Sequence, residues 1–437
     1  RYPETMASRA SKLPLALAAA VAAGALGIYL WSIRRRRKDV KKKPEDGRGE
    51  EDVRGVRVCE PGNWPPKGLP ANTEGLLNVV SWNTLCGKFH FKNHDWVPEE
   101  CKPWEYRRDL LWKYLDSFSA DVFCLQETEL RNFAKDFGIF MASKGYDYIT
   151  ADPKYRNGHD HVKPVIFYRR DRLVLKWYKG KSRTVVGEFQ VGSSRQRILI
   201  ASCHLQGGHE APTRFSQAKS LLKTIDARLR IINPNAPPPD SEGSSSSRSP
   251  SRSRKGSKRG QSQRIELKEE NPEDLKDLPP PLLLITGDMN AFVEDPCMKL
   301  FRNGFFNKSM WNEPGYKPEQ IPRKINYKTN LIGPLTDAYE RLGETKKGRP
   351  HTYQWGAPGM ELPVRKYVID YILYANERQD KTSTLGGLKL KALRLPLGEA
   401  GMEALKQPMV GIPNHWYPSD HFPLSAIFEL PRVPLRS

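Results

Sequence analysis

Short apolar runs recur along the chain from about residue 76 onward, and each run ends in a polar loop. Between them, residues 104–120 and 213–232 space their apolar side chains three and four positions apart, which is typical of helices with one buried face. Alternating strands and helices with apolar strand centres predict an α/β (α+β layered) domain whose sheets are covered on both faces. The runs with the length and composition of buried strands are 76–82, 121–127, 164–169, 197–205, 281–290, 367–374 and 422–430.

Residues 233–281 interrupt this alternation. The stretch is rich in Pro, Ser and Arg and ends in an acidic patch. It has too few apolar side chains to build a core, so we expect a disordered insertion within the domain. Ser-Arg repeats can bind RNA electrostatically, and a solvated surface loop is the alternative interpretation.

An apolar segment precedes the domain. Residues 13–33 carry no charged side chain and are long enough to cross a bilayer as a helix, and the residues that follow are strongly basic. The positive-inside rule then predicts a single-pass membrane protein with its bulk in the cytosol, anchored in an organelle outer membrane or the endoplasmic reticulum. A targeting presequence or a cleaved signal peptide is the alternative. The predicted organisation is a tail (1–12), a transmembrane anchor (13–33), a basic and Pro/Gly-rich linker (34–75) and a domain (76–432).

The composition excludes some classes of protein. With 437 residues, 38% of them apolar, and with 10 Trp, 17 Tyr and 16 Phe, the chain is not a disordered or fibrous protein. The net charge of +21 is concentrated in residues 1–43 (+9) and 240–264 (+5), which leaves +7 for the rest. That remainder is compatible with a polyanionic substrate without establishing one. Six cysteines without a C-x-x-C pair indicate free thiols in a reducing compartment.

Polar side chains stand where the predicted strands end. Each of them alone is explained as a turn former, a helix cap or a hydrogen-bonded structural histidine. Together they are more informative, because a layered fold brings strand ends to one rim, where unpaired polar groups are costly unless they bind something. The residues are Asn83, Glu127, His204, Asp288, Asn290, Asp370, Asp420 and His421.

The residue types fit a magnesium site. Mg²⁺ prefers oxygen ligands and needs only one or two protein carboxylates, because it keeps water and takes a substrate phosphate as a ligand. Glu127 suits that role, with Asn83 beside it. An ion there would stabilise charge on the leaving oxygen of a phosphodiester.

The remaining residues fit the proton transfers of phosphodiester hydrolysis. A water must be oriented and relieved of a proton, which is work for Asp288 with Asn290, or for His421. Asp370 would hold the His421 ring in the required tautomer. His204 would donate to a non-bridging phosphate oxygen.

These motifs together resemble the endonuclease/exonuclease/phosphatase superfamily, which includes deoxyribonuclease I. The resemblance runs from about residue 78 to residue 430, apart from the 233–281 insertion. It implies a four-layered α/β sandwich of two mixed sheets flanked by helices. It also implies a Mg²⁺- or Mn²⁺-dependent phosphoesterase with Asn83 and Glu127 at the metal and Asp420 near it.

Within the superfamily, four stretches are similar to the nocturnin, Angel and carbon-catabolite-repression deadenylase branch. They are residues 103–130, 165–173, 367–374 and 417–430. Leu85 agrees with this branch, because apurinic endonucleases and tyrosyl-DNA phosphodiesterases usually have Asp there. Thr128 departs from it, since these deadenylases usually have Val after the glutamate.

Two aromatic residues in the segment HTYQWGAPG, Tyr353 and Trp355, are candidates for stacking on a base, although loop packing explains them equally well. The predicted function is a membrane-anchored 3′-exoribonuclease or nucleotide phosphodiesterase, with RNA or a nucleotide as substrate. One alternative is a phosphatase or phospholipase-type phosphodiesterase that acts on a lipid or a dinucleotide. Another is an inactive membrane-bound scaffold that binds RNA.

Overall fold

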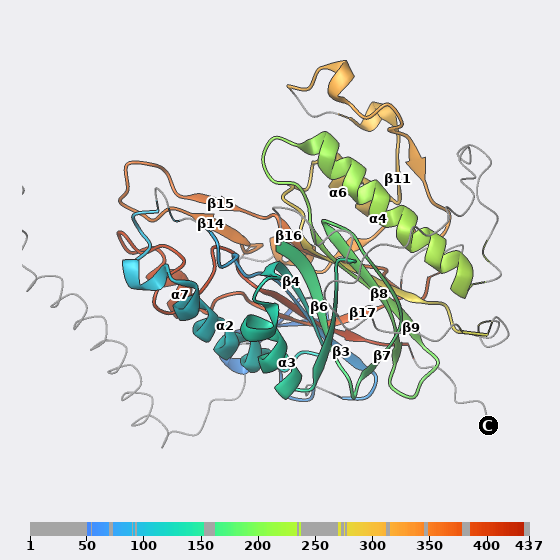
Figure 1. Cartoon of the computed structure of the whole chain (residues 1–437), viewed down its shortest axis with the longest axis horizontal. Helices are drawn as coiled ribbons and strands as arrows, with labels where there is room; N and C mark the ends of the chain where they lie inside the picture. Colours follow the sequence, from blue (N-terminus) through green and yellow to red (C-terminus); the bar gives the residue numbers. More distant parts are fainter. Residues whose placement is uncertain are drawn as a thin grey trace, which may run out of the picture. The chain divides into compact units, whose positions relative to one another are not determined.

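Two β-sheets packed face to face form the centre of the protein (Figure 1). The computed structural model describes residues 50–431 except 54, 70–72, 90, 92–93, 153–161, 234–235, 237–269, 272–274, 276–277, 312–314, 345–347 and 378–384. All of these residues belong to one unit, Glu50–Ser437. The predicted anchor at 13–33 and most of the Ser/Arg-rich insertion lie outside the described residues.

The first sheet has the order β1-β2-β17-β18-β3-β4-β6-β5, and the second has the order β13-β16-β10-β9-β8-β7. Both are mixed, since β3 runs parallel to β4 and β9 parallel to β10 while most other neighbours are antiparallel. The first sheet consists of β1 (Glu50–Val53), β2 (Val56–Cys59), β3 (Leu76–Asn83), β4 (Val122–Glu129), β5 (Tyr146–Thr150), β6 (Val162–Arg169), β17 (Lys389–Arg394) and β18 (Leu424–Glu429). The second consists of β7 (Leu173–Gly180), β8 (Thr184–Val191), β9 (Arg197–His204), β10 (Leu282–Asp288), β13 (Thr336–Asp337) and β16 (Asp370–Tyr374). Two short pairs are β11 (Phe305–Phe306) with β12 (Tyr327–Lys328), and β14 (Tyr353–Trp355) with β15 (Arg365–Tyr367).

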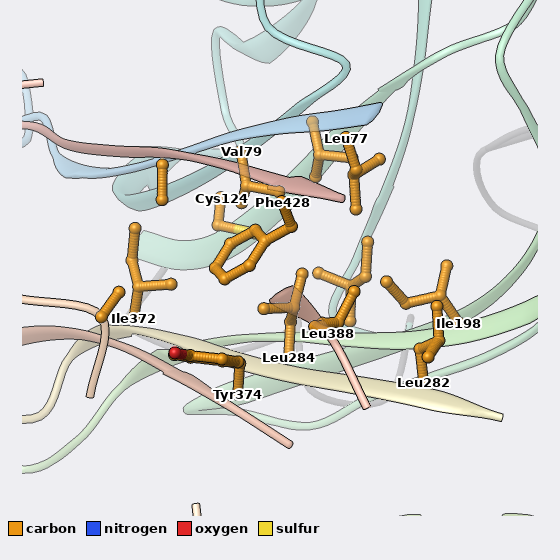
Figure 2. Close-up of a cluster of buried hydrophobic side chains, with 14 of the residues drawn as sticks. Leu77, Val79, Cys124, Ile198, Leu282, Leu284, Ile372, Tyr374, Leu388 and Phe428 are labelled. Carbon is orange, nitrogen blue, oxygen red and sulfur yellow. The ribbon is translucent and has the colours of Figure 1, made fainter. Parts of the chain in front are cut away.

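The central core lies between the two sheets, and Figure 2 shows side chains from both meeting there. Strand β10 shows why the central strands contain consecutive apolar residues. Its Leu284 points into the core between the sheets, whereas Leu283 and Ile285 pack on the opposite face under the helices. Because successive side chains of a strand point to opposite faces, a strand buried on both sides must be apolar at every position.

Helices cover both outer faces. α2 (Trp104–Phe118) and α3 (Ile139–Ser143) pack on the first sheet, and α4 (Ala211–Ile232) and α6 (Pro296–Asn303) pack on the second. A short helix, α7 (Glu399–Ala404), precedes the last segment. The helical spacing over 104–120 and 213–232 is confirmed, and so is the predicted four-layered sandwich.

The first sheet begins earlier than composition suggested. Residues 50–53 and 56–59, which the sequence analysis assigned to the linker, form β1 and β2, and β2 pairs in parallel with β17. The sequence analysis missed these two strands because their surroundings are charged and rich in Pro and Gly, although apolar side chains such as Val56 and Val58 are buried.

Glu270, near the end of the insertion, forms ion pairs with Arg197 (2.5 Å) and Lys176 (3.4 Å).

The expected single-pass membrane localisation is corrected. Among the residues that the structure describes, no helix combines the length and the apolar character that crossing a bilayer requires. The longest of them, α4, has 22 residues but is amphipathic, with Arg228 and other charged side chains along its sequence.

Candidate active site

The ends of four neighbouring strands bring the predicted site residues to one rim of the sandwich. Asn83 ends β3, Glu127 lies near the end of β4, and His204 and Asp288 end β9 and β10. Asp370 begins β16, which runs antiparallel to β10, so that its Cα pairs with that of Asp288. The loop that precedes β18 contributes Asp420 and His421.

The Asn83 amide joins two of the carboxylates. Its Nδ2 donates hydrogen bonds to Glu127 Oε1 (3.1 Å) and Asp288 Oδ2 (3.0 Å). Its own Oδ1 accepts from the backbone N–H of Leu85 (3.0 Å), which fixes the orientation of the amide. Glu127 Oε2 accepts from the backbone N–H of Cys86 (3.0 Å). The loop after β3 therefore positions the glutamate of β4.

A buried histidine–aspartate pair lies beside this centre. His421 Nδ1 is 2.9 Å from Asp370 Oδ2, and its Nε2 is 3.8 Å from Asp288 Oδ2. Thr352 Oγ1 accepts hydrogen bonds from the backbone N–H groups of Ile369 and Asp370, both at 3.0 Å. These contacts hold the aspartate so that one imidazole nitrogen is engaged and the other faces the carboxylate centre.

His204 and Asn290 complete the rim. His204 Nε2 lies 3.7 Å from Glu127 Oε1 and 3.8 Å from Asp288 Oδ2. The backbone N–H of Asn290 donates to Asp288 Oδ1 (2.8 Å), and its side-chain Nδ2 donates to the carbonyl of Leu205 (3.0 Å). Asp288 is thus oriented through one oxygen while its other oxygen faces the two histidines.

Burial and charge shift the pKa values of these groups. Burial raises the pKa of Asp420 to about 6, although the charge of His421 opposes the increase. Burial also acts to raise the pKa of Glu127, but His204 and the N–H of Cys86 outweigh it and the pKa is lowered. The pKa of His421 is raised well above its usual value, because the attraction of Asp370 and other carboxylates exceeds the opposing effect of burial.

The donor set fits a divalent cation. Four carboxylates, those of Glu127, Asp288, Asp370 and Asp420, gather at the rim, and within the described ranges the only basic side chains within 4.0 Å of their oxygens are the two histidines. One oxygen of Asp370 and one of Asp420 are buried and have no hydrogen-bond partner among the described residues. Ligand atoms of Asp288, Asp370 and His421 lie within 4.8 Å of one another. Excess buried negative charge with oxygen donors is the environment that Mg²⁺ and Mn²⁺ prefer.

A buried arginine that the sequence analysis did not identify connects the two loops of the site. Arg107 of α2 donates to the carbonyls of Leu85 (2.8 Å), Cys86 (3.0 Å) and Pro418 (3.2 Å). The sequence did carry a signal, because Arg107 lies four residues before Leu111 on the apolar face of the helix.

The two predicted aromatic residues have different surroundings. The ring of Tyr353 lies against His421, with centroids 4.9 Å apart. Trp355 packs edge to face on Trp96 (4.9 Å), and the guanidinium of Arg365 lies over the Trp355 ring (5.1 Å). Of the two, Tyr353 borders the rim and Trp355 is held in an aromatic cluster.

Comparison with known proteins identifies the family. A model of the Endonuclease/Exonuclease/phosphatase family matches residues 80–421, a range that includes every residue of the rim. The chain belongs to this family. Enzymes of the family generally depend on divalent metals, which agrees with the carboxylate-rich rim described above.

Two curated relatives indicate the branch. The chain is 24% identical to the CCR4-Not complex 3′-5′-exoribonuclease subunit Ccr4 of Saccharomyces cerevisiae over 391 residues, which cover 81% of this chain and 38% of that protein. It is 23% identical to Nocturnin of Drosophila melanogaster over 408 residues, which cover 87% of this chain and 51% of that protein. The chain thus spans about half or less of the length of these relatives.

A solved structure has the same fold. The crystal structure of ANGEL2, a 2′,3′-cyclic phosphatase, superposes with a TM-score of 0.55 at 17% identity and covers 81% of this chain and 95% of that one. The predicted superfamily and its nocturnin, Angel and Ccr4 branch are confirmed. The predicted enzyme class, a phosphoesterase hydrolase, is confirmed with them.

Proposed function

We propose that the chain is a Mg²⁺-dependent phosphodiesterase that removes nucleotides from the 3′ end of RNA. The observation that carries the proposal is the Asn83 amide, which joins Glu127 to Asp288 next to the His421–Asp370 pair. Such a site combines a carboxylate–amide centre with a group able to move a proton. The Ccr4 relative is a 3′-5′-exoribonuclease subunit, which supports RNA as the substrate.

Glu127, Asn83 and Asp420 are the residues that would hold the ion, Asn83 through its Oδ1, the oxygen that accepts from the N–H of Leu85. A bound divalent cation would neutralise the phosphate and stabilise negative charge on the leaving oxygen. Asp370 is less suited to hold it, because its Oδ2 is engaged by His421 Nδ1 at 2.9 Å. Mn²⁺ is expected to substitute for Mg²⁺, since both prefer oxygen ligands.

Asp288, Asn290 and the histidine pair would act on the water and the phosphate. Asp288 Oδ2 faces the histidines and can orient the attacking water, while the backbone of Asn290 fixes the other oxygen at 2.8 Å. His421 would move the proton through Nε2, with Asp370 holding the ring through Nδ1. His204, 3.7 Å from Glu127, would donate to a phosphate oxygen.

The test uses the 437-residue chain and a 5′-labelled oligoadenylate RNA in Mg²⁺. We expect products that shorten one nucleotide at a time from the 3′ end. His421→Ala and Glu127→Gln should abolish the products. The matched control is His415→Ala, a half-exposed histidine whose neighbours are Tyr106 and Glu100 rather than the rim carboxylates.

The same experiment includes single-stranded DNA, RNA that ends in a 2′,3′-cyclic phosphate, a dinucleotide and a phosphoinositide. Turnover of a lipid or dinucleotide alone would replace RNA as the substrate. Activity of Glu127→Gln within twofold of the parent would contradict the metal assignment. If RNA binds but none of these substrates is hydrolysed, the inactive-scaffold alternative replaces the proposal.

A further inference from the structure

A row of aromatic side chains leads away from the catalytic histidine. The rings of His421 and Tyr353 are 4.9 Å apart, and Tyr353 stacks on Tyr367 with centroids 6.1 Å apart and an interplanar angle of 11°. Phe292 then contacts Tyr367 edge to face at 5.3 Å. The row becomes more exposed along its length: Phe292 exposes 52% of its surface and Tyr367 exposes 36%.

The short β14–β15 sheet builds this row. Tyr353 pairs with Tyr367 and Trp355 with Arg365, two residues further along, so that all four side chains share one face of the ribbon. Tyr353 is at the end of this face nearest the rim. Burial raises the pKa of its hydroxyl, and the negative charges of Asp420 and Asp288 raise it further. The face therefore begins at the catalytic rim and continues outward.

The inner rings are already occupied by neighbours. Tyr353 has His421 and Tyr367 beside it, and Trp355 has Trp96 and Arg365. Tyr367 and Phe292 are the members whose surfaces remain accessible. Large aromatic side chains at the edge of a polar site are informative when, as here, a third to a half of their surface stays in contact with solvent.

The chemistry of these two rings matches one kind of partner. Phe292 follows Asn290 by two residues, so it belongs to the loop that orients Asp288. Arg365 and Lys366 of β15 are exposed and can attract phosphates along the same ribbon. An unpaired base offers a π-face of matching size, whereas a base within a duplex is already stacked.

We propose that Tyr367 and Phe292 form a stacking subsite for the unpaired base next to the scissile phosphodiester. This inference rests on the proposed function and adds to it a requirement for single-stranded substrate. The subsite consists of accessible rings, in contrast to the Tyr353 and Trp355 pair that the sequence suggested.

The experiment compares two oligonucleotides of equal length, one with adenine at the 3′-terminal nucleotide and one with an abasic sugar there. For Phe292→Ala and Tyr367→Ala, we expect kcat/KM on the first substrate to fall by about 5- to 150-fold, the equivalent of stacking on one base. The value on the abasic substrate should stay within twofold of the parent. Tyr367→Phe, which keeps the ring, should retain parental values. Phe305→Ala is the matched control, because Phe305 is 44% exposed and lies on β11.

Equal losses on both substrates, or no loss on either, would overturn the subsite while the proposed hydrolysis stands. If the parent hydrolyses neither oligonucleotide, the proposed function fails, and the subsite is then judged by binding alone. Fluorescence anisotropy with labelled oligoadenylate should show weaker binding for both alanine variants than for Phe305→Ala. Identical affinities, or equal binding to a blunt duplex, would refute the stacking role.

Discussion

Arg107 is the side chain whose replacement tests the architecture of the site most directly. It is 1% exposed, and its three hydrogen bonds join the loop after β3 to the loop that carries Asp420 and His421. Burial lowers its pKa to about 10, and the charges of Asp420 and Glu127 oppose that effect. The guanidinium therefore stays charged at neutral pH. Arg107→Met keeps most of the length of the side chain and removes every donor.

The loss of stability in Arg107→Met can be estimated from the carbonyl groups that would lose their hydrogen-bond donor. Three carbonyls, those of Leu85, Cys86 and Pro418, would lose a charged donor in a buried setting. A buried polar group left without a partner costs about 1–3 kcal/mol. Methionine recovers part of this through apolar packing, so we expect the free energy of unfolding to fall by about 3–5 kcal/mol. Arg107→Lys keeps the charge but offers a single ammonium, and its loss should be about half as large.

Urea unfolding followed by tryptophan fluorescence measures this difference, and Lys113→Met is the control on the exposed side of the same helix. The control should stay within about 0.5 kcal/mol of the parent. We also expect Arg107→Met to need more Mg²⁺ for half-maximal hydrolysis, because Glu127 and Asp420 are held by the loops that Arg107 joins. A free energy of unfolding within about 1 kcal/mol of the parent, with an unchanged Mg²⁺ requirement, would refute this reasoning.

Three further predictions concern the rim. Asp370→Asn should lower kcat by about 10³–10⁴-fold with little change in KM, measured by steady-state kinetics, because the amide cannot hold His421 in the same tautomer. Burial raises the pKa of Asp420 from 3.8 to about 6, so its contribution to stability is fully present below pH 3.8 and is lost as the pH rises through 6. A bound cation must displace that proton, so Mg²⁺ should raise Tm more at pH 7.5 than at pH 5; calorimetry showing equal increments would contradict this. Gly287→Ala should lower the free energy of unfolding by at least about 3 kcal/mol in urea titrations, because a Cβ there would lie 2.1 Å from the Cys203 carbonyl oxygen at a φ of +133°.

The sequence was sufficient to predict the layers and the rim. Strands such as β10 begin with consecutive apolar residues, Leu282 to Ile285, because both faces of the strand are buried, and that pattern is readable without a structure. The same reasoning expected Asn83, Glu127 and Asp288 to meet, and the hydrogen bonds of Asn83 join them. The roles of these residues in catalysis remain predictions.

Other features depend on contacts between distant segments and leave little trace in the sequence. Arg107 looks like an ordinary charged helical residue until α2 is placed against the loop at Pro418, 311 positions away. Thr352 is similar, since it holds Asp370 through backbone hydrogen bonds that no spacing rule predicts. Edge strands were missed for a related reason. β7 exposes Val174, so its pattern lacks the apolar continuity of the central strands.

Residues with a strained backbone conformation are concentrated at the rim. Among the described residues, five other than glycine have positive φ, and three of them, Leu85 (52°), Glu127 (59°) and Asn290 (48°), belong to the loops and strand ends of the site. Each such residue costs about 1–2 kcal/mol, so the fold must supply contacts that outweigh the cost. Glu127 shows how. It lies at an irregularity in the pairing of β4 with β6, which releases its side chain from the strand alternation, and the Cys86 N–H and the Asn83 amide then hold the carboxylate. The strained conformation of Glu127 persists because the loop after β3 donates hydrogen bonds to its carboxylate, which points toward the centre of the rim. Arg107 holds that loop through the carbonyls of Leu85 and Cys86. The orientation of Glu127 therefore depends on the buried arginine as well as on the strained backbone.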